Sequence, residues 1–118
     1  MKLKEEIKPI VLTFEDGKVY TLEFSRKVVR QMAEDKVDIS EIETYPILIY
    51  DLFYYAFKKN HPLVTKEFTS NIIDNEFGGI AHIDPKVVER LAQLYYVPFE
   101  TLSEDETKTK NSKMTISL

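Results

Sequence analysis

The stretch that most constrains the fold lies in the middle of the chain, at residues 45–61, YPILIYDLFYYAFKKNH. Apart from Asp51 and two late lysines it is uncharged, and residues 50–57 carry five aromatic rings. Pro46 suits the first position of a helix, and Pro62 suits its end, because the residue before a proline avoids the α region. At helical spacing the apolar residues share one broad face: Ile49, Leu52, Phe53, Ala56 and Phe57. We therefore predict a central helix, too short and too interrupted to cross a membrane.

Before this helix, the sequence PIVLTFEDGKVYTLEF predicts two β-strands around a turn. Side chains alternate between the two faces of a strand, so the loop length decides which residues face each other. A two-residue Asp16-Gly17 turn would mix apolar and polar faces. A three-residue loop, Glu15–Gly17, with Gly17 in the left-handed conformation, keeps the apolar faces together. The pairs expected on the apolar side are Leu12–Tyr20 and Ile10–Leu22.

The segment between the hairpin and the central helix predicts one helix and one short turn. Ser25 is a good N-cap for an amphipathic helix over residues 26–36. Further on, Ser40 and Glu43 have the spacing of a capping box, which predicts a short helical turn.

Two more helices are predicted after the central one. Thr65 suits the N-cap of a helix over residues 66–77, which a glycine pair ends. Asp84 and the proline after it predict the start of a last helix over residues 85–96. Pro98 is expected to break or kink it, and one further turn over residues 98–102 is left open. The predicted fold class is therefore α+β, with an N-terminal β-hairpin packed on a small bundle of about four helices.

The length of 118 residues is that of one domain with a single modest core. We place this globular domain at residues 9–102 and expect a frayed N-terminus at residues 1–8. Residues 103–118, SEDETKTKNSKMTISL, are polar and poor in large apolar groups, which predicts a disordered tail.

Charge and composition argue against several classes of function. A formal net charge of −4 and a pI near 5.2 disfavour a nucleic-acid partner, which usually needs a basic stripe. A helix-turn-helix over residues 66–76 and 85–96 is disfavoured as well, because its link is long and the exposed face of its second helix is of mixed charge. The chain has no cysteine, and its N-terminus lacks the apolar core of a signal peptide, so a cytoplasmic location is expected.

No pattern in the sequence predicts catalysis, a metal site or a cofactor. The only histidines, His61 and His82, lie in predicted loops, and we interpret both as solvated loop residues. The acidic pairs lie in turns or in the tail, and the glycine pair lacks the residues of a phosphate-binding loop. We therefore predict a protein that is not an enzyme.

The aromatic residues of the central helix admit two interpretations of equal weight. In the first, the rings are buried among themselves as core. In the second, some of them leave a partly exposed apolar patch that binds another protein, since tyrosine is favoured on such surfaces. The candidate partner-binding residues are Ile47, Leu48, Tyr54, Tyr55 and, on the last helix, Tyr96.

Four stretches of the sequence carry a resemblance to a known family: PIVLTFEDGKVYTLEFSRKVVRQMAE, LFYYAFKKNHP, FGG and ERLAQLYYVPFETL. Their order of hairpin, aromatic helix, glycine pair and final helix resembles the tail assembly chaperones of long-tailed phages and prophages of Gram-positive bacteria. The resemblance covers residues 9–102 and includes no chemical motif.

The resemblance implies a non-catalytic, helix-rich protein without a cofactor. It implies that the chain binds the tape-measure protein, keeps it soluble, and helps the tail-tube protein assemble around it. Such a protein acts in the cytoplasm of the bacterial host and is absent from the mature virion. In many relatives a frameshift adds a second domain, to which the polar tail would serve as a linker.

Two alternatives remain open at this point. One is a small structural or adaptor protein that stays in a phage assembly, held through the exposed edges of its hairpin. The other, less favoured, is a DNA-binding regulator. Self-association of the chain is compatible with each of these.

Overall fold

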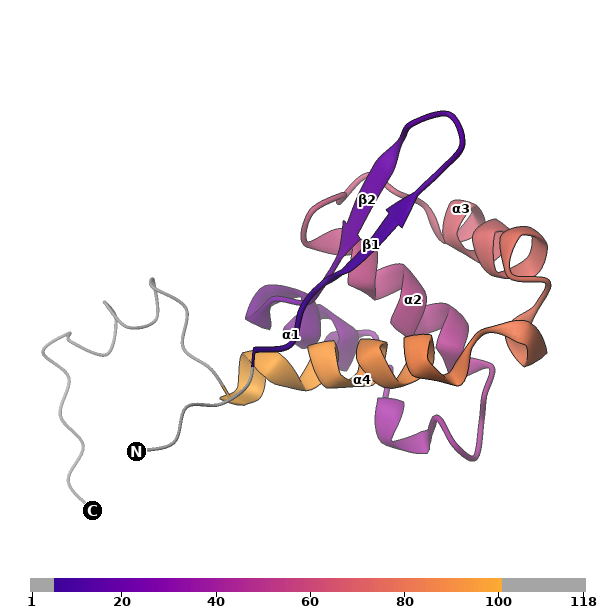
Figure 1. The fold of residues 1–118 in the computed structure, drawn as a ribbon. Coiled ribbons are helices and arrows are strands. Elements are labelled where there is room, and N and C mark those ends of the chain that lie inside the picture. Colours follow the sequence, from indigo (N-terminus) through magenta and orange to yellow (C-terminus); the bar gives the residue numbers. More distant parts are fainter. Residues whose placement is uncertain (1–5, 101–118) are drawn as a thin grey trace, which may run out of the picture.

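The computed structural model describes residues 6–100, so the expectations for residues 1–5 and for the tail from residue 103 lie outside the described residues. A two-stranded antiparallel hairpin is followed by four α-helices, which confirms the α+β fold (Figure 1). The strands and α-helices are β1 (Ile10–Thr13), β2 (Val19–Leu22), α1 (Arg26–Glu34), α2 (Leu48–Lys58), α3 (Lys66–Asn71) and α4 (Pro85–Glu100). Three short helical turns lie between them, η1 (Ile39–Glu41), η2 (Ile72–Glu76) and η3 (Ile80–His82).

The hairpin has the predicted register. Leu12 faces Tyr20, and the Phe14 amide donates to the Lys18 carbonyl at 2.9 Å, which closes a three-residue loop. Gly17 has a φ of 89°, in the region that favours glycine, as this loop requires. Turn chemistry near the tip therefore fixes the pairing of the whole hairpin.

The outer edge of β2 is tied to the end of α2. His61 Nε2 accepts a hydrogen bond from the Thr21 amide at 2.9 Å, and the Asn60 amide group donates to the Thr21 carbonyl at 3.1 Å. Two residues after Thr21, the Glu23 amide donates to the Ala56 carbonyl of α2 at 3.0 Å. The interpretation of His61 as a solvated loop residue is therefore wrong, because the fold brings it against a strand 40 residues earlier. His82, by contrast, is exposed.

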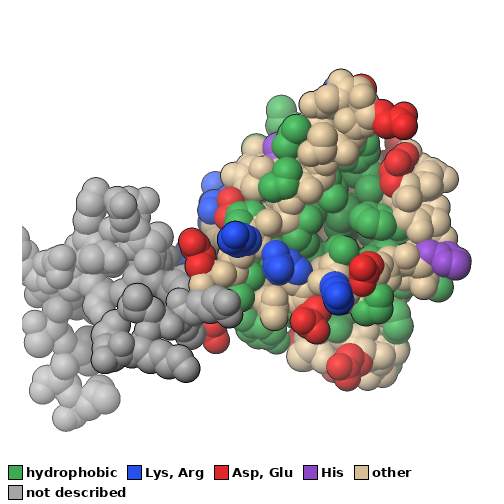
Figure 2. Space-filling view, in the orientation of Figure 1, with side chains coloured by type: hydrophobic (Ala, Val, Ile, Leu, Met, Phe, Trp, Pro, Cys, Tyr) green, Lys and Arg blue, Asp and Glu red, His purple; other side chains and the backbone are tan. Residues whose placement is uncertain are grey.

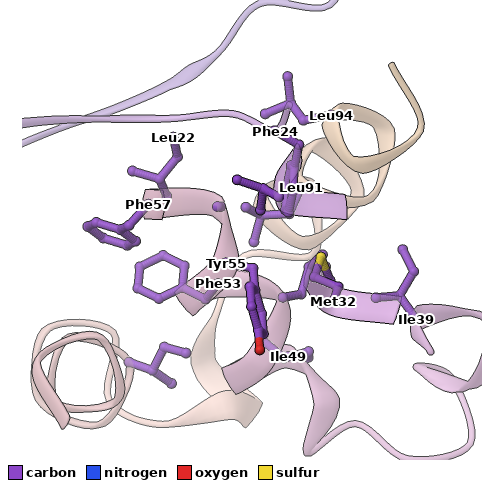
Figure 3. Close-up of a cluster of buried hydrophobic side chains, with 14 of the residues drawn as sticks. Leu22, Phe24, Met32, Ile39, Ile49, Phe53, Tyr55, Phe57, Leu91 and Leu94 are labelled. Atoms are coloured by element: carbon purple, nitrogen blue, oxygen red, sulfur yellow. The ribbon is translucent and has the colours of Figure 1, made fainter. Parts of the chain in front are cut away.

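Helix α2 is the centre of the core, and β2, α1, α3 and α4 all pack on it (Figures 1 and 3). The side chains of Leu52, Ala56 and Phe57 have no exposed surface. The α-helix begins at Leu48, so Pro46 lies in the tight turn before it and not at its first position. In that turn the amides of residues 48–50 donate to carbonyls three residues earlier, which leads the chain into the helix.

The caps of α1 and of the next turn are set by short polar side chains. Ser25 Oγ accepts from the Val28 amide at 3.2 Å, as predicted. The short turn after α1 also forms, but its cap is Asp38, whose carboxylate accepts from the Ser40 amide at 3.0 Å. The capping box expected at Ser40 is therefore wrong by two residues. Ile39, next to the true cap, is buried and joins the core.

Helix α3 begins at the predicted cap, where Thr65 Oγ1 accepts from the Phe68 amide at 3.1 Å. Its second half widens into the π-helical turn η2, which the sequence pattern did not predict. The turn ends where the Gly79 amide donates to the Ile73 carbonyl at 2.8 Å, with Gly78 at a φ of 85°. The glycine pair therefore ends the helix, as expected.

Helix α4 begins after Asp84, whose carboxylate accepts from the Lys86 amide at 2.9 Å. It then runs through Pro98 to Glu100, so Pro98 does not break the helix, and the further turn allowed after Pro98 continues it. Arg26 on α1 donates from Nε to the Pro98 carbonyl at 2.7 Å, which supplies a partner for a carbonyl at the helix end. Near its start, Arg90 donates to the Lys8 carbonyl at 3.1 Å and anchors the chain before β1.

Candidate partner-binding surface

Tyr55, one of the candidate binding residues, is buried, with 2% of its surface exposed. The expectation that it belongs to an open patch is wrong, because α1 covers this side of α2. Its ring lies between Phe53 and Met32 in the middle of the core, and its oxygen points away from that cluster (Figure 3). Tyr55 therefore contributes to the core of the monomer and not to a partner surface.

The Tyr55 hydroxyl lies at the edge of the core and donates a hydrogen bond to the carboxylate of Asp35, the C-cap residue of α1. Burial, and then this hydrogen bond, raise the pKa of Tyr55 well above its usual value. The same hydrogen bond lowers the pKa of Asp35, because it stabilises the carboxylate. The pair joins α2 to the end of α1.

Tyr54 is half-buried and is covered by cations. The Nζ atoms of Lys58 and Lys66 lie 5.0 and 5.5 Å from its ring centroid, and its ring contacts that of Tyr55 edge-on at 5.0 Å. Lys66 also lies 3.8 Å from the Asp51 carboxylate. The surroundings of Tyr54 are thus a charged cluster, in which cation–π contacts use the ring face.

The start of α2 is where the predicted patch is open. Ile47 is 65% exposed, Tyr45 two residues earlier is 58% exposed, and Leu48 is half-buried. Tyr45 and Ile47 lie in the turn that enters α2, whereas Leu48 is the first residue of the helix and lines a hollow together with Gln31 of α1.

The largest group of exposed rings lies on the last two turns of α4. Tyr96 is 46% and Phe99 57% exposed, and their ring centroids are 6.1 Å apart. Tyr95 contacts both, at 5.0 and 5.5 Å, and joins them to the core through Phe24 at 5.8 Å. We call Tyr95, Tyr96 and Phe99 the α4 aromatic cluster.

Beside this cluster lies a groove between α1 and α4 with a volume of about 600 Å³. Its wall on α1 is made by Val29 and Ala33, and its wall on α4 by residues of the cluster together with Pro98. Arg26 and Arg30 stand along it on α1, so the groove combines an apolar floor with a positively charged margin. We call it the α1/α4 groove.

Sequence reasoning found one member of this surface, Tyr96, and missed Tyr95 and Phe99. The spacing of 95, 96 and 99 places the three rings on adjacent positions of one helix, and that signal was present. It was not used because Pro98 was expected to break or kink the helix before Phe99. Proline costs a helix one amide donor, yet α4 continues through Pro98, whose carbonyl accepts a hydrogen bond from Arg26.

Two other features, a metal-binding cluster and a membrane-spanning helix, are absent from residues 6–100. That part of the chain holds no cluster of three or more histidine, aspartate or glutamate side chains arranged to bind a metal. None of its helices has the length and apolar character needed to span a bilayer. The two helices considered above as a helix-turn-helix correspond to α3 and α4. Both pack mainly on α2, and η3 lies in the link between them.

The comparisons with known proteins give a family without a described activity. No curated protein and no solved structure matches the chain. One family model matches residues 6–118, so the match includes the tail that the sequence analysis set apart from the domain. On this match, the chain belongs to the family described as a domain of unknown function, DUF5055.

Proposed function

We propose that this chain is a non-catalytic phage tail assembly chaperone that binds the tape-measure protein and keeps it soluble while the tail tube assembles. The proposal starts from the resemblance over residues 9–102. In this role the protein acts in the cytoplasm of the bacterial host and is absent from the mature virion.

The observation that carries the proposal is the α1/α4 groove with its aromatic cluster. A groove between two helices accepts a third helix, whose apolar side chains fill the space between them. Tyrosine and phenylalanine supply large contact area at low entropic cost, and both Tyr96 and Phe99 are about half exposed. The surface therefore suits an amphipathic helix, the kind of segment that a long helical tape-measure protein offers.

The charges of the groove restrict its occupant further. Arg30 stands along one side, so a helix with acidic residues flanking its apolar stripe fits better than a basic one. The apolar floor is small and its margin is exposed, which favours modest affinity and release during assembly. A chaperone needs such reversible binding, because the tail tube must later cover the same helices.

Co-expression with the tape-measure protein tests this function. We expect the full chain to co-purify with that protein and to move it from the insoluble to the soluble fraction. Phe99→Ser should reduce the co-purified amount about tenfold or more, as expected for a central aromatic contact. Tyr45→Ser is the matched control, because Tyr45 is equally exposed but does not line the groove, and it should leave binding unchanged.

Two results would count against the proposal. Failure of the unmodified chain both to co-purify and to solubilise would reject the chaperone function. Equal loss of binding in Phe99→Ser and Tyr45→Ser would reject the groove as the binding surface.

A structural or adaptor protein of a phage assembly is the second candidate, favoured by the open outer edge of β1 described below. Mass spectrometry of purified virions separates the two functions, because an adaptor remains in the particle and a chaperone does not. A DNA-binding regulator has no specific observation in its favour. Support for that function would require retention of the protein on DNA that decreases as the salt concentration rises.

A further inference from the structure

The two edges of the hairpin differ in how their backbone groups are used. In an antiparallel pair, alternate residues direct their amide and carbonyl groups inward to the partner strand and outward to the edge. The hydrogen bond from the Phe14 amide to the Lys18 carbonyl shows which residues alternate in this way. The backbone groups of Leu12 are directed toward β2, and those of Val11 and Thr13 are directed toward the open edge. On β2 the outward amide and carbonyl of Thr21 are bonded to His61 and Asn60, just after α2. Within residues 6–100, no hydrogen bond from another element reaches the outward groups of Val11 and Thr13.

A hollow of about 560 Å³ lies directly beside this open edge. Ile72 of η2 and Phe77, the residue after η2, form its floor together with Phe14. Figure 2 shows hydrophobic side chains in the hollow below the hairpin tip. Glu15, Asp16 and Glu76 stand around it, so its margin is acidic. The edge thus offers backbone donors and acceptors, an apolar floor and a negative rim to one incoming strand.

We propose that two copies of this chain associate through their β1 strands, antiparallel and centred on Leu12, to form a four-stranded sheet. The proposal is independent of the chaperone function. In this register Val11 of each copy lies opposite Thr13 of the other, and each such pair exchanges two backbone hydrogen bonds. The addition of a strand to an exposed sheet edge is a common mode of association.

Backbone chemistry selects this register over its neighbours. Centring on Val11 would place Thr13 opposite Pro9, which has no amide to donate. Centring on Thr13 would place Val11 opposite Glu15, inside the tip turn. Only the register centred on Leu12 satisfies all the outward groups of both strands.

Charge favours the same arrangement. The register brings Lys8 of one copy beside the Glu15-Asp16 turn of the other, so a cation meets the acidic rim at both ends of the joined strands. Lys8 is exposed, and its backbone is held by Arg90, which places it in line with β1.

Strand β1 also lacks the features that usually keep edges apart. Its four residues, IVLT, include no charge, no proline and no bulge. Val11 is 57% exposed, and Val19 beside it on the outer face is 51% exposed. Because the strand is short, the association is expected to be weak and to depend on concentration in the micromolar range or above.

Amide exchange measured by NMR on the full chain at rising concentration tests this proposal. We expect the amides of Val11 and Thr13 to become protected as concentration rises, in step with a monomer-to-dimer transition in sedimentation velocity. Protection at neither amide at any concentration would overturn the proposal. Protection that is independent of concentration and lost on removal of residues 101–118 would also overturn it, and would assign the edge to the chain's own tail.

Matched proline variants give a second test. Thr13→Pro removes an outward amide from the β1 edge and should weaken dimerisation about tenfold or more. Val19→Pro removes an outward amide from the opposite edge and should leave dimerisation unchanged. Equal effects of the two variants, with both folded by circular dichroism, would contradict pairing through β1.

Charge reversal tests the register itself. Lys8→Glu alone and Asp16→Lys alone should each weaken the dimer about threefold, in the range of exposed ion pairs. The double variant should recover most of the loss, since it restores opposite charges across the interface. Losses that add in the double variant would reject the register centred on Leu12.

Discussion

Two regions of this molecule, α2 and the last two turns of α4, carry closely spaced aromatic rings, but the rings differ in how far they are buried. Phe57 on α2 is fully buried and contacts the rings of Phe53, Tyr20 and Phe68. Phe99 on α4 has only the other two rings of its own cluster as aromatic neighbours among residues 6–100, and it is 57% exposed. Helix α2 is enclosed by β2, α1, α3 and α4, whereas the end of α4 rests on α1.

The comparison shows that the number of neighbouring elements, and not the density of rings, decides whether an aromatic segment is core or surface. Burial of apolar area requires atoms on the other side, and a helix end beyond its neighbours has none to meet. The ring-rich segment that stood out in the sequence is therefore the core, and the candidate binding surface belongs to a segment with fewer rings.

The sharpest test of this comparison removes one ring from each region. Phe57→Ala should lower the free energy of unfolding by about 3–5 kcal/mol, because it leaves a cavity in a closed core. Phe99→Ala should lower it by less than about 1 kcal/mol, because that side chain is already in contact with water. Urea denaturation of the two variants measures both values. Similar losses would show that the end of α4 is as enclosed as α2.

A smaller effect is expected where the end of α2 meets β2. His61→Leu keeps much of the side-chain volume but removes the acceptor of the Thr21 amide, which should cost about 1–2 kcal/mol. His82→Leu is the control, because that exposed histidine has no such role. Urea denaturation of both variants measures the difference. An equal stability of the two variants would contradict the structural role of His61.

The smallest effect concerns pH and the Tyr55–Asp35 pair. The pKa of Asp35 is lowered in the folded state, so the pair contributes stability above the usual aspartate pKa of 3.8, and this is lost as pH falls through the lower folded value. The pKa of Tyr55 in the folded state is raised above its usual value of 10.0. The stability contributed by the pair is therefore present below pH 10.0 and is lost as the pH rises through the higher pKa of the folded state. Tyr55→Phe should therefore flatten the decline of stability at both ends.

An NMR titration of Asp35 measures the same effect directly. In Tyr55→Phe its pKa should return toward the usual value, since the largest cause of the shift has been removed. An unchanged Asp35 pKa in this variant would contradict the bond, and Gln31→Ala serves as a control for the weaker contact from within α1.

Local chemistry made much of the fold predictable. The loop Glu15–Gly17 fixed the hairpin register, and the side chains of Ser25, Thr65 and Asp84 marked three helix starts correctly. Each of these signals acts within a few residues, so no knowledge of the distant chain is needed. The cap expected at Ser40 was wrong because the Asp38 carboxylate, two residues earlier, takes that role. The break considered at Pro98 does not occur, and a distant Arg26 bonds the Pro98 carbonyl.

The sequence alone determined that this protein is an α+β domain with its ring-rich segment as a helix, because periodicity, caps and turns are encoded over short distances. Only the tertiary structure decided that Tyr55 is core, that His61 serves a strand, and that the exposed rings gather at the end of α4. Exposure depends on which remote segments cover a given face, and residues such as Thr21 and His61 meet only after 40 intervening positions have folded.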